Sequence, residues 1–252
     1  DCTSAKSSLA SDSRLFLMTS IEGQDVQQFK KGTSDAETYT LSFHVRSNKT
    51  GTYQVNIEDN DNVRIVGSTY TISSANTWEK KEITFVADTT GAFADDNGDS
   101  LAIMWALVAG TDNSSGAVPT AWEAKSNTDR GAGLNINLAD STSNEWYITG
   151  VQLEVGSTAT PFEHRSFGEE LKLCQRYFAK EDGVKMRNFT GSSIAVSIPH
   201  FWKTTMRAAP TITGTNASVN ETINTQGFSA YKTSISSGSQ WQLTGTEADA
   251  EL

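Results

Sequence analysis

The chain has 252 residues, of which 30 are acidic and 20 are basic, so its formal net charge is −10 at pH 7. This charge argues against nucleic acid and anionic membranes as partners, because contacts with phosphate groups need a concentrated basic surface. The longest apolar run, 101–110, has about half the length of a membrane-spanning helix, which excludes membrane insertion by such a helix.

The length accommodates two domains or one large β domain. The sequence begins at Asp1 rather than at methionine, so we expect it to be a fragment or a processed product of a longer chain. Two cysteines, Cys2 and Cys174, are too few for the disulfide framework of a small secreted domain. We therefore expect Cys174 to be a buried structural residue.

Short segments that alternate apolar and polar residues indicate β-strands. Residues 37–48 and 51–58 show this alternation, and the turn residues between them predict a hairpin. Further strands are predicted at 62–72, 77–87, 101–109 and 144–155. Because each of these two-faced strands buries one side, together they predict an antiparallel β-sandwich over residues 1–165.

Alternation also assigns the tryptophans to faces of the strands. In 144–155 one face would carry Tyr147, Val151, Leu153 and Val155, and the other Trp146, Ile148, Gln152 and Glu154. Trp105 is predicted to lie in the core, and Trp78, at the start of a strand, to serve in packing rather than as a platform for a ligand. Trp122 lies in a less regular segment and Trp146 on a polar row, so these two are the candidates for exposure. A core or interface position is the alternative for each.

The polar faces of the predicted strands are the candidate carbohydrate-binding surface. A β-sandwich binds a sugar through an exposed aromatic ring beside fixed polar groups, because the ring stacks on the apolar face of the sugar. The candidate residues are Trp122 and Trp146 as stacking aromatics, with His44, Arg46, Gln54, Asn56, Gln152 and Glu154 as polar contacts.

A linker helix is predicted at 166–179, after the sandwich. Ser166 and Glu169 form the capping-box pattern, and the helix would run over 167–178. Leu171, Cys174 and Phe178 share one apolar stripe. Because a helix of about 12 residues is marginal alone, this stripe needs a partner surface, either in its own domain or on a neighbouring chain.

Residues 180–252 are predicted to form a small β-rich domain, with short strands at 192–198, 211–215 and 240–244. Residues 1–165 carry 22 acidic and 12 basic side chains, and residues 166–252 carry eight of each, so the two net charges are −10 and 0. This asymmetry supports a domain boundary after Arg165. The C-terminal part has few large apolar residues, and oligomerisation would supply the burial that it lacks.

Motifs for catalysis or cofactor binding are missing from the sequence. No zinc motif, phosphate-binding loop or nucleophile elbow occurs, so we predict no catalytic residue and no cofactor. Asp95, Asn97 and Asp99 imitate the first ligand positions of a calcium loop, but later positions do not fit the helix-loop-helix motif. A looser structural calcium site there, or near Glu22 and Asp25, stays open, with a solvated acidic turn as the alternative.

The residues around the predicted helix are similar to those of a known family. The similarity covers WYITGVQLEVGSTATPFEHRS at 146–166 and FGEELKLCQRYF at 167–178, with further matches at 39–62, 75–85, 206–213 and 248–252. These segments resemble phage tail-fibre and related virion structural proteins, in which a carbohydrate-binding-module-like jelly roll passes through a short helix to a fibre tip. The resemblance implies a jelly-roll topology for the sandwich and a natural C-terminus at Leu252.

The resemblance also implies a function. Members of this family form homotrimeric virion appendages that act outside the cell, joined to other tail proteins. The implied role is non-enzymatic attachment of the virion to polysaccharide or lipopolysaccharide on the host surface, with Leu171, Cys174 and Phe178 at the trimer interface. One alternative is a passive structural spacer that binds no glycan. The other is a polysaccharide depolymerase, for which Glu58 and Glu154 would be the paired carboxylates.

Overall fold

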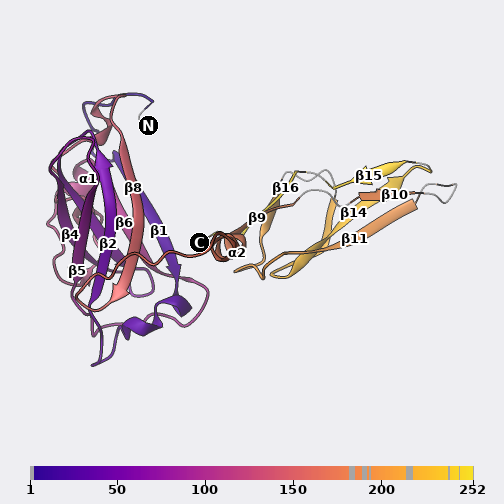
Figure 1. Ribbon diagram of the computed structural model, residues 1–252, viewed down its shortest axis with the longest axis horizontal. Coiled ribbons are helices and arrows are strands. Elements are labelled where there is room, and N and C mark those ends of the chain that lie inside the picture. The colour runs from indigo at the N-terminus through magenta and orange to yellow at the C-terminus, as the bar shows by residue number, and fades with distance from the viewer. Residues whose placement is uncertain are drawn as a thin grey trace. The chain divides into compact units, whose positions relative to one another are not determined.

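The computed structural model describes residues 3–181, 185–188, 192, 194–213, 218–237, 239–243 and 245–251, so Cys2 lies outside the described residues. The chain divides into two units, residues 1–163 and 164–252, each with its own apolar core (Figure 1). This division falls two residues before the predicted boundary at Arg165. The predicted linker helix belongs to the second unit.

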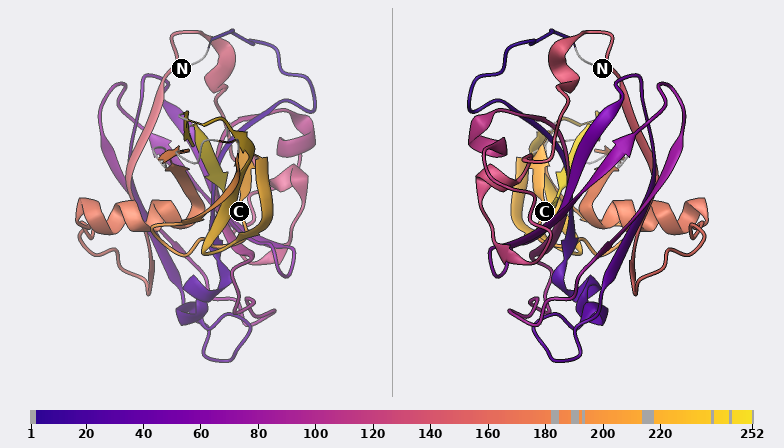
Figure 2. Two further views of the ribbon diagram at one scale, coloured as in Figure 1. Left: turned by 90° about the vertical axis from the view of Figure 1, so that its right-hand side faces the viewer. Right: turned by 90° about the vertical axis from the view of Figure 1, so that its left-hand side faces the viewer.

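Two antiparallel sheets form the first unit (Figure 1; Figure 2). The larger sheet has the order β1-β6-β3-β4-β7, with bounds Arg14–Glu22, Asp99–Ala109, Gly51–Asp59, Arg64–Ile72 and Glu123–Ala124. The smaller sheet has the order β5-β2-β8, with bounds Glu79–Phe85, Tyr39–Ser47 and Trp146–Val155. Short helices lie in the connections: η1 (Gly23–Asp25), η2 (Gln27–Phe29), α1 (Thr111–Ser114), η3 (Asn127–Asp129) and η4 (Leu138–Asp140). The predicted mainly β, jelly-roll sandwich is confirmed. The predicted hairpin is wrong, because β2 pairs with β5 and β8 whereas β3 pairs with β4 and β6 in the other sheet.

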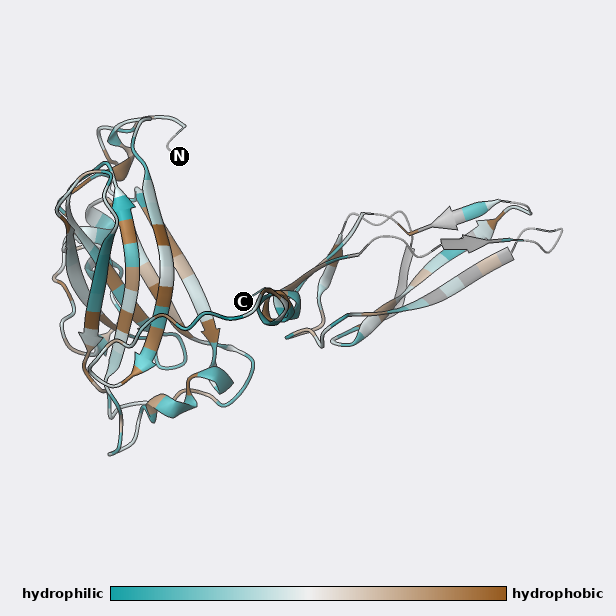
Figure 3. Ribbon diagram, viewed as in Figure 1, coloured by the Kyte–Doolittle hydropathy of each residue, from teal (hydrophilic) through white to brown (hydrophobic). Residues whose placement is uncertain are grey.

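The core of the first unit lies between the two sheets, where alternation had placed it. The inward residues of β2 and β3 are all buried: Tyr39, Leu41, Phe43, Val45, Tyr53, Val55 and Ile57. Trp105 of β6 is buried among them, as predicted. Figure 3 shows hydrophilic and hydrophobic residues alternating along these strands. Burying each such large side chain contributes about 1.5–3 kcal/mol, so this core dominates the stability of the unit.

β1 is a long strand that alternation did not predict. Its apolar residues Leu15, Phe16, Leu17 and Met18 follow one another, so no period of two marks the segment. β1 pairs with β6 and forms an edge of the larger sheet, and Leu15, Leu17 and Met18 remain exposed there. This segment forms a strand because it pairs with the buried strand β6, and its own sequence carries no alternating pattern that would predict it.

The second unit contains α2 (Phe167–Tyr177) and, in the part that the structure describes, three small antiparallel sheets. Their orders are β12-β16-β9, β11-β14-β13 and β10-β15. The strands are β9 (Phe178–Glu181), β10 (Lys185–Arg187), β11 (Ile194–Phe201), β12 (Thr211–Thr213), β13 (Ser218–Asn224), β14 (Gly227–Ile235), β15 (Gln240–Gln242) and β16 (Thr246–Asp249). The three predicted strands correspond to β11, β12 and β15. Ser193, Gly214, Thr215 and Thr244, which those predictions included, lie outside the described residues, as does Leu252.

The core of the second unit is small. Among the described residues its buried apolar cluster has nine members, four of them alanine, against twenty members in the first unit. Its centre is aromatic: Trp202 and Phe228 stack with ring centroids 5.0 Å apart, and His200 contacts both rings. Such a core gives little hydrophobic stabilisation for a unit of this length.

α2 begins with the predicted capping box. The hydroxyl of Ser166 accepts a hydrogen bond from the N–H of Glu169, and the Glu169 carboxylate accepts one from the N–H of Ser166. Within the described chain α2 buries none of its side chains, and Leu171, Cys174 and Phe178 are exposed. The expectation that Cys174 is buried is therefore wrong for the single chain. Of the helices that the structure describes, none is both long and apolar enough to cross a membrane.

A buried lysine closes one end of the first unit. The side chain of Lys31, which follows η2, is fully buried, and its Nζ lies 2.5 Å from Oδ2 of Asp59 and 3.1 Å from Oδ2 of Asp88. The same ammonium donates hydrogen bonds to the carbonyls of Thr90 and Gly91, at 2.8 and 2.7 Å. Four oxygen atoms from two other segments thus surround one cation, which offsets its desolvation.

Further contacts complete this charged cluster. The Lys31 ammonium lies 5.3 Å from the ring centroid of Phe93 and 5.1 Å from that of Trp122. Nε of Arg64 donates to Asp88 at 2.7 Å. Burial would raise the pKa of Asp88, but hydrogen bonds from Arg64, from a backbone N–H and from Lys31 outweigh it and lower that pKa. Asp88 therefore stabilises the folded state at neutral pH, and this contribution is lost as the pH falls below about 4.

Replacing Lys31 with methionine keeps much of the side-chain volume but removes the cation between Asp59 and Asp88. We expect the free energy of unfolding of the first unit to fall by about 3–5 kcal/mol, because buried carboxylates lose their partner. Hydrogen exchange of the β2 and β3 amides measures this change. The matched control is Lys30→Met, which removes only an exposed ion pair with Glu37 and should cost about 1 kcal/mol or less. Equal stability of the two variants would contradict this role of Lys31.

Candidate functional site

The outer face of the smaller sheet carries a row of large side chains near one end of β2. The row consists of Trp78, which precedes β5, Arg46 of β2 and Tyr147 of β8, and we call it the aromatic platform. Arg46 and Tyr147 are paired in the β2–β8 register. Trp78 adjoins Glu79, the residue paired with Val45 on the other side of β2. The next row along the same face consists of Lys80, His44 and Thr149.

Both aromatic rings of the platform are open to solvent. Trp78 is 45% exposed and Tyr147 is 40% exposed, with ring centroids 6.4 Å apart and planes inclined at 56°. The guanidinium carbon of Arg46 lies 5.5 Å from the ring centroid of Tyr147, a cation–π distance. Nε of Arg46 is buried and has no hydrogen-bond partner in the described part of the chain. The Tyr147 ring is therefore positioned by a cation on its face, and the Trp78 ring packs against Tyr147.

The phenol of Tyr147 interacts with Glu145. A hydrogen bond to the Glu145 carboxylate raises the pKa of Tyr147 above its usual value. The side chain therefore has a carboxylate partner at its hydroxyl and the guanidinium of Arg46 over its ring.

A β-bulge at Gly150 decides which residues of β8 face solvent. The pairing of β8 with β2 shifts between Ser42 and His44, so Gly150 and Val151 stand opposite the single residue Phe43. Gly150 has a φ of +59°, in the left-handed region that favours glycine. Because side chains alternate with a period of two, one extra residue exchanges the inner and outer faces beyond the bulge.

This exchange corrects the predicted face of Trp146. Before the bulge Tyr147 points outward and Trp146 packs against the core, whereas beyond it Gln152 and Glu154 point outward. An unbroken alternation had placed Trp146 on the same face as Gln152 and Glu154, and that prediction is wrong. The sequence nevertheless contained a signal for the bulge, because an isolated glycine inside a strand pattern, here Gly150, indicates one.

Trp122 does not act as an exposed stacking residue either. Its Nε1 donates to the carbonyl of Val86 at 2.8 Å, and its ring lies edge-on to Tyr39 with centroids 6.3 Å apart. Its ring also lies 5.1 Å from the ammonium of Lys31, so the residue belongs to the closed end of the sandwich. Trp78, which we expected to serve in packing rather than as a ligand platform, is 45% exposed. It lies just before its strand, where alternation says little about direction.

Gln54 and Asn56 are covered by the segment that follows β6. They project from the outer face of the larger sheet, where Gln54 donates to the carbonyl of Asp129 and Asn56 to that of Arg130. The N–H of Gly133 donates to Oε1 of Gln54 at 2.7 Å. Both side chains are fully buried, so the prediction that they contact a ligand is wrong. They attach a long connection to the sheet instead.

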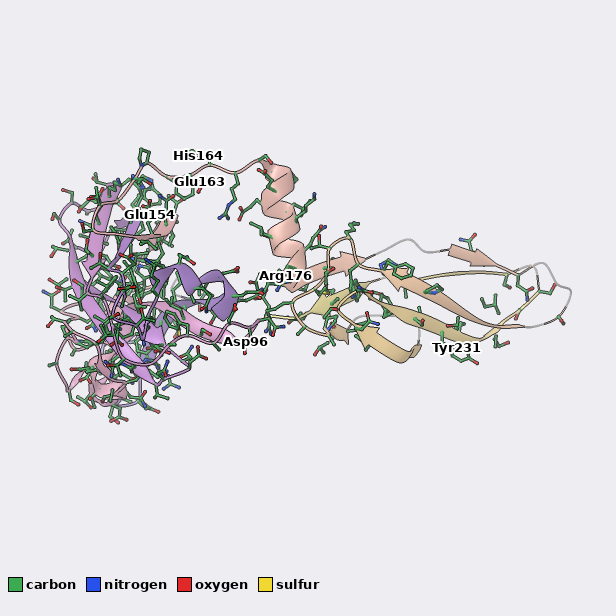
Figure 4. All side chains as sticks on the ribbon, turned by 90° about the horizontal axis from the view of Figure 1, so that it is seen from below. Asp96, Glu154, Glu163, His164, Arg176 and Tyr231 are labelled. Carbon is green, nitrogen blue, oxygen red and sulfur yellow. The ribbon has the colours of Figure 1, made fainter. Side chains whose placement is uncertain are left out.

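Gln152 and Glu154 hold the segment that leaves β8. Glu154 accepts hydrogen bonds from the N–H and the hydroxyl of Thr160, and Gln152 accepts one from the N–H of Glu163. Figure 4 shows Glu154 and Glu163 on the same side of the first unit. Hydrogen bonds from Gln152 and Thr160 lower the pKa of Glu154. These polar groups are occupied within the chain. Of the predicted polar contacts, Arg46 therefore belongs to the platform and His44 lies in the row beside it.

The two carboxylates considered for catalysis do not meet. Glu58 is buried on the larger sheet, bound by Arg130 and Lys125, while Glu154 lies on the outer face of the smaller sheet. The predicted pairing of Glu58 with Glu154 is therefore wrong. Within the described ranges no group of three or more His, Cys, Asp and Glu side chains is arranged to hold a metal ion. Neither acidic segment considered for calcium gathers such a group.

The platform and the neighbouring row combine two kinds of contact. Trp78 and Tyr147 offer exposed ring faces, and Arg46, Lys80 and His44 offer hydrogen-bond donors beside them. A surface of this composition can stack on the apolar face of a ring-shaped ligand while fixed polar groups bind its hydroxyls. This flat surface suits an extended ligand that lies across it, rather than a small ligand that needs an enclosing pocket.

No protein-family model and no curated protein sequence matches the chain. Among solved structures, discoidin II from Dictyostelium discoideum aligns with 98% of this chain and 80% of its own, with 12% sequence identity and a TM-score of 0.22. A similarity of this size carries no argument about function, which has to come from the geometry of the platform.

Replacing Gly150 with alanine puts a Cβ on a residue with positive φ, 3.4 Å from Nδ1 of His44. We expect the first unit to lose about 1–2 kcal/mol of unfolding free energy, the cost of a left-handed non-glycine residue. Gly150→Asn should lose less, because asparagine tolerates this conformation better. Hydrogen exchange of the β2 and β8 amides measures both. The control Gly168→Ala, in α2 with open space around it, should not destabilise the second unit. Wild-type stability in Gly150→Ala would argue against the bulge.

Proposed function

We propose that the first unit binds carbohydrate through the aromatic platform, and that the chain is the receptor-binding part of a phage tail fibre. In this role it attaches the virion to polysaccharide or lipopolysaccharide on the host surface, without enzymatic activity. The observation that carries the proposal is the exposed pair Trp78 and Tyr147, with Arg46 over the ring of Tyr147. The resemblance of residues 146–178 to tail-fibre proteins supplies the biological setting.

Exposed rings of this kind favour a sugar over other ligands for a physical reason. One face of a pyranose presents C–H groups that stack on an aromatic ring, while its hydroxyls need donors and acceptors around the rim. Beside the rings, Arg46, Lys80 and His44 supply donors, and Thr149 supplies a hydroxyl that both donates and accepts. A flat site of this size makes few contacts with each sugar, so a single site binds weakly.

Assembly into a homotrimer would compensate for weak single sites. The apolar stripe of α2, with Leu171, Cys174 and Phe178, is exposed in the single chain, and the second unit has a small core. Both observations support burial against other copies through this unit. Three platforms on one fibre then bind a multivalent surface with far higher avidity than one platform alone.

The passive spacer is the alternative that the same experiments address. A spacer would assemble through α2 but would bind no glycan. The depolymerase is not proposed, because Glu58 is neutralised by Arg130 and Lys125 and lies on the other sheet from Glu154.

Trp78→Ala and Tyr147→Ala should each weaken glycan binding about tenfold, which corresponds to about 1.4 kcal/mol of stacking energy. The measurement uses labelled protein on an array of bacterial capsular polysaccharides and lipopolysaccharides. Leu15→Ala is the matched control, since Leu15 is similarly exposed but lies on the edge of the other sheet. If the wild-type protein bound no glycan on the array, the receptor-binding function would be rejected in favour of the passive spacer.

Leu171→Asp should dissociate the trimer, because it places three charges in the apolar contact between the α2 helices. Sedimentation velocity measures the molecular mass directly. Lys172→Asp is the control, because Lys172 is an exposed neighbour outside the predicted stripe, and it should remain trimeric. A wild-type protein that sediments as a monomer would rule out assembly through α2.

A further inference from the structure

A cavity of about 370 Å³ opens at the end of the first unit that lies away from the aromatic platform. Its walls come from the η1–η2 segment with the residues that follow it, and from the loop after β5. Phe29 of η2 contacts Tyr39, the first residue of β2. Arg46 of the platform lies next to Ser47, the last residue of β2. The cavity and the platform are therefore separate surfaces at opposite ends of β2.

The floor of the cavity is held rigidly. Val26, Lys31 and Phe93 line it, and all three are buried. Lys31 connects the two walls, because its ammonium bonds to the carbonyls of Thr90 and Gly91 in the opposite wall. A floor fixed in this way is formed before any ligand arrives, which reduces the entropic cost of binding.

The rim of the cavity carries polar atoms that the described chain does not use. Gln27 lines the cavity, and its Nε2 donates to the carbonyls of Gly23 and Ala94, which leaves its Oε1 as an acceptor that no described residue uses. The Asp35 carboxylate accepts no hydrogen bond from the described residues. Lys30 bonds to Glu37 at 2.9 Å and keeps further N–H donors. Two acceptors and one donor thus surround the opening.

The charge at the rim selects against anions. Lys30 is neutralised by Glu37, and Lys31 is neutralised by the buried carboxylates that close this end of the sandwich. Asp35 forms no ion pair in the part of the chain that the structure describes, but it lies close enough to Lys30 to raise the pKa of that ammonium. Lys30, Glu37 and Asp35 together therefore leave one net negative charge at the opening. A sulfate, phosphate or uronate group would be repelled there, whereas hydroxyl groups can donate to both acceptors.

We propose that this cavity is a second carbohydrate site, which binds a single neutral pyranose such as the end of a glycan chain. In this arrangement Asp35 accepts hydrogen bonds from two neighbouring hydroxyls, Gln27 accepts a third, and Lys30 donates to a ring or hydroxyl oxygen. The volume lies at the small end of the range for ligand cavities, which suits one sugar rather than a chain. The proposal rests on the carbohydrate-binding function proposed for the first unit and adds a terminal-residue specificity.

The test uses the full chain and the methyl α-glycosides of glucose, mannose and galactose, followed in TROSY spectra of ¹⁵N-labelled protein. At least one glycoside should shift the amides of residues 26–35 and 92–93. Asp35→Ala should weaken that binding at least tenfold, while the matched control Asp25→Ala, an exposed acid of η1 outside the cavity, should leave it unchanged. No shift with any of the three glycosides, or equal binding by Asp35→Ala, would overturn the second site.

Two further measurements separate this site from the platform. Trp78→Ala should leave the shifts at 26–35 intact, so a failure of polysaccharide binding at the platform would not remove the cavity. Conversely, if polysaccharide binds through Trp78 and the cavity amides stay unmoved by the glycosides, the platform stands and the cavity is overturned. A methyl glucuronide should bind at the cavity at least tenfold more weakly than the matching glucoside; equal or tighter binding there would overturn the assignment to neutral sugars.

Discussion

One buried cation organises the closed end of the sandwich. The ammonium of Lys31 sits among oxygen atoms from the end of β3 and from the segment after β5, namely Asp59, Asp88, Thr90 and Gly91. Because the side chains of Lys31, Asp59 and Asp88 are shielded from water, each depends on the others for its compensation, and none can be lost alone without a large cost. The two connections are thereby fixed to one another, and the cavity beside them has a rigid floor.

A second local constraint decides what the smaller sheet presents to solvent. The bulge at Gly150 turns Trp146 into the core and leaves Tyr147 outside, next to Arg46 and opposite Trp78. Beyond the bulge the outward residues bind the segment that leaves β8 instead of a ligand. The platform is thus the part of this face where aromatic rings are exposed and polar groups remain available. A binding surface and a cavity at opposite ends of β2 give one sandwich two places to contact a glycan.

The two units differ in how they are stabilised. The first has a large apolar core and a net charge of −11, whereas the second has a small, alanine-rich core, a helix with an exposed apolar stripe, and a net charge of only +1. Electrostatic repulsion between copies is therefore weakest where apolar surface is left uncovered. This division suits a molecule whose second unit assembles while its first unit faces a ligand.

The strand alternation, the inward residues of β2 and β3, and the start of α2 can all be predicted from the sequence, because period and capping chemistry are local properties. The sequence pattern does not predict which polar residues meet solvent, because that depends on how distant segments pack. Alternation assigns a residue to a face, but Gln54 and Asn56 are buried because a distant segment covers that face. A single inserted residue at Gly150 likewise exchanges the two faces for the rest of a strand. A polar side chain is exposed only where no other segment covers it, and the covering segments are remote in sequence.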